Sequence, residues 1–156
     1  MLYIKPFKES DAQFLCSLLS DREIFELTCA EKYGEFPLSV ADILAYYQNP
    51  AALPFTPFYE NRAAGHILIE KREKSAHLGS VIIKPELQGL GLGKEMFSFA
   101  VSKAKEKGAD FVTIGVFEEN KRALSLYLSQ GFEIFDASER VLNGQSKTYL
   151  LLRKDF

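Results

Sequence analysis

Three glycines at alternate positions, Gly89, Gly91 and Gly93, constrain this chain most, because they separate a strand-like run from a long helical pattern. The preceding stretch, "GSVIIKP", is rich in β-branched residues and predicts a strand. After the glycines, apolar residues recur with helical spacing on one face: Met96, Phe97, Ala100, Val101 and Ala104. The chain therefore passes from strand to helix through a loop whose backbone a ligand can approach closely.

Free N–H groups at a helix N-terminus attract anions, so this loop predicts a phosphate site. A dinucleotide fingerprint G-x-G-x-x-G that starts at Gly89 would need glycine where Lys94 stands. A Walker A loop with its lysine at Lys94 would need glycine at position 88 and serine or threonine at position 95, and the chain has neither. The pattern that remains is Gln-x-x-Gly-x-Gly, beginning at Gln88.

The rest of the chain predicts an α+β fold with helices layered on a mixed, mostly antiparallel central sheet. The order of elements is β, α, α, βββ, α, β, α, ββ, which gives about seven strands and about four helices. Strands are expected within residues 2–7, 54–61, 63–73, 76–85, 108–117 and 131–153, and the last range holds two strands around Asn143-Gly144, a hairpin signal. Helices are expected within 9–21, 37–49, 92–107 and 120–130, and the segment 22–37 is ambiguous.

The composition is that of an ordinary globular protein and excludes several function classes. Hydrophobic residues make up 47% and charged residues 26% of the 156 residues, enough for a single domain, 1–156, with a buried core. The net charge of -2 predicts neither a nucleic-acid nor a membrane partner. No apolar run has the length of a signal peptide or a membrane span, and Cys16 and Cys29 lack metal-ligand spacing. We expect a cytoplasmic protein with buried reduced thiols and no metal, either monomeric or a homodimer.

A second motif lies about thirty residues beyond the glycine loop, in "NKRALSLYLSQGF". Taken singly, Asn120 fits an ordinary helix N-cap and Tyr127 fits a core aromatic. Together with the glycine loop, however, the pattern Asn-x-x-Ala-x-x-x-Tyr followed by Gly-Phe resembles the GCN5-related N-acetyltransferases (GNAT family). The resemblance runs from about His77 to Phe135.

This resemblance implies a GNAT-like fold, acetyl-coenzyme A (acetyl-CoA) as co-substrate, and a role for each matching residue. The strand residues Val81, Ile82 and Ile83 would meet the pantetheine arm, and an N–H there would polarise the thioester carbonyl. The residues expected around the pyrophosphate are Gln88, Gly89, Leu90, Gly91, Leu92, Gly93 and Lys94. Asn120 and Ala123 would also bind the cofactor, and Tyr127 would act as the general acid that protonates the departing thiolate.

The implied reaction is direct attack by an amine on the thioester in a ternary complex, which requires positioning, an oxyanion donor and removal of a proton. His77 is the candidate general base, because an imidazole pKa near 6.5 suits proton removal around neutral pH. His66, Glu70 and Glu73 on the preceding strand are alternatives, and strand alternation puts His66 and Glu70 on one face. A chain of waters is a further alternative. At the position where some relatives carry a glutamate, this chain has Gly115.

The acceptor stays open between a protein N-terminus, another peptide amine and a small-molecule amine. The resemblance implies an acceptor site built from residues 25–47 and 138–147. Acidic and aromatic side chains in the first segment would suit a cationic amine, or simply form a solvated helix beside the core: Glu26, Glu31, Glu35, Tyr33, Phe36, Tyr46 and Tyr47. The alternative function is a non-catalytic acyl-CoA binding or sensing domain, and a nucleotide phosphate-binding module is a third.

Overall fold

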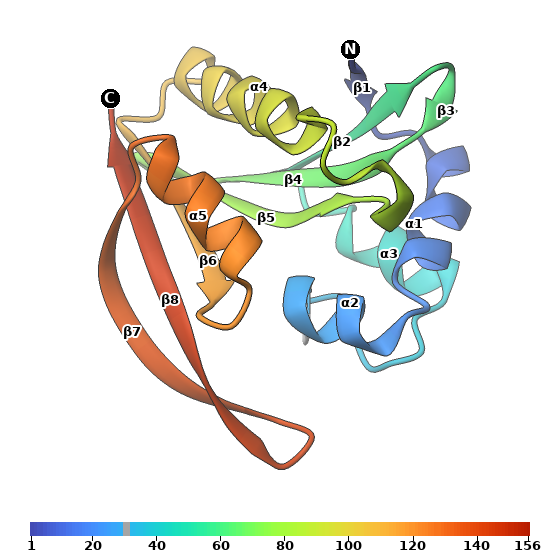
Figure 1. Ribbon diagram of the computed structural model, residues 1–156. Coiled ribbons are helices and arrows are strands. Elements are labelled where there is room, and N and C mark those ends of the chain that lie inside the picture. The colour runs from blue at the N-terminus through green and yellow to red at the C-terminus, as the bar shows by residue number, and fades with distance from the viewer. Residues whose placement is uncertain (30–31) are drawn as a thin grey trace.

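The computed structural model describes residues 1–29 and 32–156, and its centre is a mixed, mostly antiparallel sheet of eight strands (Figure 1). The strand order is β1-β2-β4-β5-β6-β8-β7, and β3 pairs with β2 at the side. The strands are β1 (Tyr3–Pro6), β2 (Ala52–Tyr59), β3 (Arg62–Ala63), β4 (Gly65–Lys71), β5 (Ser75–Ile83), β6 (Phe111–Phe117), β7 (Glu133–Leu142) and β8 (Gln145–Asp155). The fold class predicted from sequence is confirmed.

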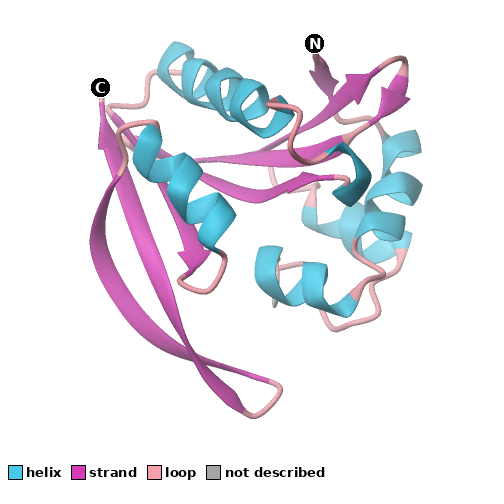
Figure 2. Ribbon diagram, viewed as in Figure 1, coloured by secondary structure: helices cyan, strands magenta, loops and turns pink. Residues whose placement is uncertain are grey.

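In the described part of the chain, five α-helices flank the sheet in two groups (Figure 2). They are α1 (Ala12–Leu18), α2 (Arg22–Thr28), α3 (Val40–Tyr46), α4 (Leu92–Glu106) and α5 (Lys121–Ser129). The additional helix relative to the prediction is α2, in the segment that the sequence left ambiguous, where the Asp21 side chain caps it by accepting from the Ile24 N–H at 3.1 Å. The additional strand is the two-residue β3.

Two apolar clusters hold the layers together. The first joins the sheet to α4 and α5 through residues such as Ile67, Phe97 and Tyr127. The second joins the sheet to α1, α2 and α3 through residues such as Leu15 and Ile43. Because strand side chains alternate between faces, the sheet contributes to both clusters.

The sheet opens where β5 and β6 separate. These two strands run parallel. Only residues Ser75–Leu78 of β5 pair with Phe111–Ile114 of β6, although both strands continue beyond these residues. Near the same point, the register between β4 and β5 shifts, and Ser80 on β5 takes a positive φ of 47°. The β4 backbone approaches closely here, since a Cβ added to Gly65 would lie 2.0 Å from the Ile82 carbonyl oxygen. On the side away from β4, the second half of β5 therefore has no paired strand in the described part of the chain.

The long hairpin of β7 and β8 extends beyond the rest of the sheet (Figure 1). Its turn residues Asn143 and Gly144 have φ of 51° and 75°, the backbone that the Asn-Gly signal predicts. The turn reaches α2, where the Asn143 side-chain amide donates to both oxygens of Glu26 at 2.9 Å. The tip of the hairpin thus lies against α2.

Candidate functional site

A cavity of about 640 Å³ lies beside the separated end of β5, and we call it the loop cavity. Its lining joins β5, the glycine loop, the first turn of α4, the start of α5 and one side of α2. The lining residues are Glu23, Ile24, Leu27, Thr28, Val81, Ile82, Ile83, Gln88, Gly89, Gly91, Gly93, Lys94, Met96, Asn120, Arg122, Ala123, Leu126 and Tyr127. The two motifs found in the sequence therefore meet at one cavity.

Two residues expected around the pyrophosphate, Leu90 and Leu92, do not line this cavity. The Leu90 side chain is 57% exposed, and Leu92 is 2% exposed within the core between α4 and the sheet. Their side chains are directed elsewhere because Leu90 sits at the tip of the turn and Leu92 begins the buried face of α4. For these two positions, only the backbone is available to a ligand in the cavity.

The backbone of the loop is suited to bind an anion. Gly89 and Gly91 take φ of 86° and 81°, a conformation that favours glycine. The Gln88 N–H donates to Pro85 and the Glu95 N–H to Gly91. Between them, the six N–H groups of residues 89–94 have no hydrogen-bond acceptor within the described part of the chain. Such a run of free donors at a helix N-terminus matches the requirements of a phosphate group.

Side chains fix this loop in place and add positive charge. The Gln88 side-chain amide donates to the Ile83 carbonyl at 3.3 Å, and its oxygen accepts from Arg122 Nη1 at 3.4 Å. The sequence analysis missed Arg122, although its place two residues after Asn120 was a usable signal once the motifs were aligned. Arg122 and Lys94 both line the cavity.

Asn120 and Tyr127 come from the start and the body of α5. The Asn120 side-chain oxygen caps the helix, accepting from the Ala123 N–H at 3.4 Å. Tyr127 is 5% exposed, and its ring stacks on Phe97 with the ring centres 5.0 Å apart. Burial raises the pKa of Tyr127 above its ordinary value, with a smaller contribution from Tyr149. The phenol is therefore protonated at neutral pH and can donate a proton into the cavity.

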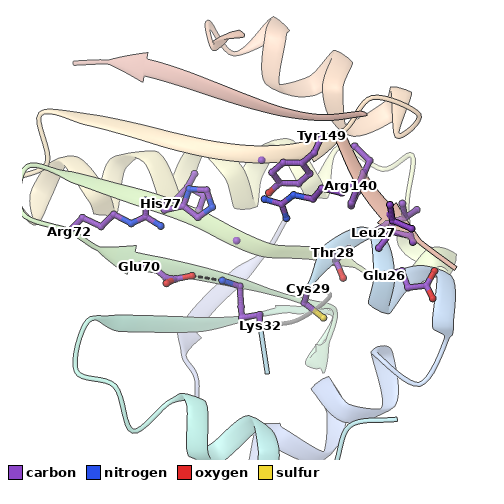
Figure 3. Close-up of a pocket in the computed structure, with 16 residues that line it drawn as sticks. Glu26, Leu27, Thr28, Cys29, Lys32, Glu70, Arg72, His77, Arg140 and Tyr149 are labelled. Carbon is purple, nitrogen blue, oxygen red and sulfur yellow. Dashed lines mark hydrogen bonds and ion pairs between the residues drawn. The ribbon is translucent and has the colours of Figure 1, made fainter. Parts of the chain in front are cut away.

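A second cavity of about 570 Å³ lies next to the first, between α2, the sheet and the hairpin (Figure 3). We call it the hairpin cavity. It is lined by Glu26, Leu27, Thr28, Cys29, Lys32, Glu70, Arg72, His77, Leu78, Gly79, Gly115, Phe117, Arg140, Val141, Leu142 and Tyr149. Leu27 and Thr28 line both cavities, so the two share a wall. Residues 25–47 and 138–147, the predicted acceptor segments, both contribute to it.

His77 lines the hairpin cavity with its ring beside Arg72 (Figure 3). Its Nδ1 lies 2.8 Å from the Thr113 hydroxyl. Burial, together with the charges of Arg72 and Lys32, lowers the pKa of His77 to about 4, against the opposing effect of Glu70. At neutral pH the imidazole is therefore neutral and has a lone pair with which to accept a proton.

Of the alternative bases, only Glu70 lines the hairpin cavity. It forms an ion pair with Lys32 and accepts from the Tyr46 hydroxyl at 3.1 Å. Burial disfavours its charged form, but the hydrogen bond and charge of Lys32 outweigh burial and lower the pKa of Glu70, so the group is ionised at neutral pH. Glu73 follows the end of β4 and lines neither cavity.

His66 shares a face with Glu70, as strand alternation predicts, but it is 1% exposed and lines neither cavity. Its Nε2 lies 2.7 Å from the Tyr47 hydroxyl. Burial lowers the pKa of His66 to about 3. Its contacts with Tyr47 and Phe7 make it part of the packing under α3.

Gly115 has a specific neighbour that explains the absence of a side chain there. A Cβ added at Gly115 would lie 1.7 Å from the Tyr149 hydroxyl oxygen, so the tyrosine fills the space. The guanidinium carbon of Arg140 lies 3.8 Å from the centre of the Tyr149 ring. Burial raises the pKa of Tyr149, although Arg140 and Lys32 oppose the shift. The sequence analysis did not single out Arg140 or Tyr149, because only the fold brings β6, β7 and β8 together.

The acidic and aromatic residues expected to bind the acceptor are dispersed. Glu26 lines the hairpin cavity, where Arg22 binds it at 3.3 Å, whereas Glu35 is exposed and lines neither cavity. Glu31 lies outside the described residues. The aromatic side chains pack in the cluster under α1, α2 and α3 and line neither cavity: Tyr33, Phe36, Tyr46 and Tyr47.

Neither cysteine is poised as a nucleophile. Cys29 lines the hairpin cavity, but burial raises the pKa of its thiol to about 12, so the reactive thiolate is scarce at neutral pH. The half-buried Cys16 thiol lies 3.1 Å from the Leu38 carbonyl oxygen.

None of the helices in the described part of the chain combines the length and the apolar character needed to cross a membrane.

Comparison with known proteins gives consistent matches. The profile of the Acetyltransferase (GNAT) family matches residues 22–132. The chain is 33% identical over 81 residues to the uncharacterized N-acetyltransferase YvbK of Bacillus subtilis, covering 51% of this chain and 52% of that protein. It is 25% identical over 119 residues to the peptidyl-lysine N-acetyltransferase YjaB of Escherichia coli, covering 76% and 74%.

Among solved structures, the spermidine N-acetyltransferase of Vibrio cholerae in complex with CoA and spermine superposes with a TM-score of 0.85 at 20% identity, covering 99% of this chain and 95% of that one. The match with YvbK spans about half of that relative's length. The structural likeness establishes the fold, and the profile covers well over half of the sequence. The chain belongs to the acetyltransferase (GNAT) family.

Proposed function

We propose that this protein, acting as a single domain over residues 1–156, transfers the acetyl group of acetyl-CoA to a primary amine by direct attack in a ternary complex. The observation that carries the proposal is the pair of cavities that share Leu27 and Thr28 as a common wall. Two ligands can then be bound at once in adjacent cavities, and direct transfer requires that both substrates be bound side by side.

The residues of the loop cavity fit acetyl-CoA. The free N–H groups of residues 89–94 suit its pyrophosphate, and Arg122 and Lys94 add positive charge. The β5 residues beyond Leu78 have no partner on β6, so the backbone groups that point away from β4 are available to a pantetheine arm, apart from the Ile83 carbonyl, which accepts from Gln88. Several relatives have names that include N-acetyltransferase, which supports the same assignment.

Two groups of this chain would move protons in the reaction. Neutral His77, or a water that it orients, would take a proton from the attacking amine, and an N–H of β5 would stabilise the developing oxyanion. Tyr127 would donate to the departing sulfur. Because burial raises the pKa of Tyr127 above the thiol pKa of about 8.5, the phenol stays protonated and would donate a hydrogen bond to the thiolate as it departs.

The decisive test is release of the CoA thiol from acetyl-CoA, screened over amino acids, polyamines, aminoglycosides and N-terminal peptides. We expect release above background hydrolysis with at least one class of amine. Isothermal titration with CoA separates this proposal from the sensing alternative. Tight CoA binding with no turnover on any amine would favour a non-catalytic acyl-CoA binding domain, and ATP binding in preference to CoA would contradict both.

A further inference from the structure

The charged side chains that line the hairpin cavity indicate which kind of acceptor it can bind. Five charged side chains line its described part: Glu26, Lys32, Glu70, Arg72 and Arg140. Both carboxylates are already paired, Glu70 with Lys32 and Glu26 with Arg22. Neither Arg72 nor Arg140 forms an ion pair with a carboxylate of the described residues. The described lining therefore offers two guanidinium groups to a ligand and no carboxylate that lacks a cation.

Arg140 is the better placed of the two to recognise a ligand. Arg140 lines the cavity with its guanidinium group over the Tyr149 ring, and the guanidinium carbon lies 3.8 Å from the ring centre (Figure 3). Tyr149 is itself held in contact with Gly115 on β6. Stacking occupies one face of the guanidinium plane and leaves its in-plane N–H donors available, which is the geometry that binds a carboxylate with two hydrogen bonds.

We propose that the acceptor is a small amine that carries a carboxylate on the same molecule, an amino acid or a close analogue, and that Arg140 binds this carboxylate. The inference rests on the proposed function and specifies its substrate. A cavity of about 570 Å³ is of the size that encloses a small molecule. A polyamine is a poor match for the described lining, since each additional ammonium group would meet Arg72 or Arg140 and no free carboxylate among these residues would offset the repulsion.

The first experiment measures thiol release with free amino acids, with the carboxamide of each active one, and with spermidine and a peptide as comparison acceptors. We expect at least one amino acid to exceed its carboxamide in kcat/KM by tenfold or more. A carboxamide, polyamine or peptide that performs better than every amino acid overturns the inference and leaves acetyl transfer standing.

The second experiment compares Arg140→Gln with Arg153→Gln. Arg153 is a matched control, because its guanidinium group also stacks on an aromatic ring, Phe111 at 3.6 Å, but it lines neither cavity. We expect Arg140→Gln to raise the amino-acid KM by roughly 10- to 100-fold, as loss of a charge-assisted hydrogen-bonded pair does. Affinity for CoA should be unchanged in both variants, and Arg140→Lys should recover part of the loss.

A binding measurement separates failure of this inference from failure of the proposed function. N-acetylated amino acids are the expected products and keep the carboxylate, so in the presence of CoA they should raise the Tm of the wild-type protein and not that of Arg140→Gln. If no amino acid is acetylated and no N-acetylated amino acid shifts the Tm, the inference is wrong even when CoA binds. Absence of CoA binding would instead contradict the proposed function.

Discussion

The Tyr127 phenol is buried against Phe97, and burial raises its pKa, so the hydroxyl keeps its proton at neutral pH. On the proposed function, Tyr127→Phe removes that proton and keeps the stacked ring. We expect kcat to fall by roughly 100-fold, the lower range for loss of a general acid, while the Kd for CoA changes by less than about twofold. Steady-state kinetics and calorimetry on the same preparation check both values. Unchanged kcat would exclude Tyr127 as the acid.

The protonation state of His77 gives a pH prediction. Its pKa is lowered to about 4, and only the neutral imidazole can accept a proton. Expressed per unprotonated acceptor amine, kcat/KM should therefore be constant above pH 5 and decline as the pH falls through about 4. The control is His77→Gln, which should lower the plateau and abolish that acidic limb. An acidic limb near pH 6.5, or a limb that persists in His77→Gln, would assign the base to another group or to water.

At the scale of the strands, Gly115 on β6 contacts the Tyr149 side chain on the paired strand β8. An alanine at position 115 would place its Cβ 1.7 Å from the Tyr149 hydroxyl oxygen, so the ring must move. We expect Gly115→Ala to lower the free energy of unfolding by about 1–3 kcal/mol, typical of overpacking. Urea denaturation measures this difference.

Two further variants make the Gly115 prediction specific. Gly93→Ala is the control, because its added Cβ would meet only Leu126 at 3.8 Å and should leave stability nearly unchanged. The double variant Gly115→Ala/Tyr149→Leu should lose less unfolding free energy than the two single variants lose together, since the shorter side chain removes the overlap. Strict additivity would contradict the contact.

Local patterns predicted the elements well and the site only in part. The glycine loop, the apolar face of α4 and the Asn143-Gly144 turn depend on neighbouring residues, so the sequence contains their signals. The assembly of the hairpin cavity depends on α2, β6 and β7 meeting in space, which no local pattern encodes. Arg140 and Tyr149 were not singled out for that reason. Spacing alone also does not show that Leu90 and Leu92 can offer the loop cavity only their backbone groups.

For the whole molecule, buried His66 makes stability depend on pH. Its pKa is lowered to about 3 in the folded protein, compared with an unperturbed value of about 6.5. Between these values the unfolded chain binds the additional proton, so the free energy of unfolding falls as the pH drops below about 6.5. A single such group contributes a slope of up to about 1.4 kcal/mol per pH unit.

This dependence can be measured by urea denaturation at pH 7, 6 and 5. His66→Gln keeps a hydrogen-bonding partner for Tyr47 and cannot be protonated in this range, so its stability should vary less with pH than that of the wild type. His77→Gln provides the comparison for the other histidine with a lowered pKa. Equal slopes for His66→Gln and the wild type would mean that His66 is already accessible to protons in the native state.

Because Leu27 and Thr28 line both cavities, a ligand in either cavity lies against the same two side chains. A ligand in one cavity that shifts these side chains changes the affinity of the other cavity, and thermodynamic reciprocity makes the factor the same in both directions. An acceptor that tightens CoA binding tenfold is therefore itself bound tenfold more tightly once CoA is present. A substitution at position 27 that alters this coupling should therefore change the affinities for both substrates by the same factor, without touching any group that reacts.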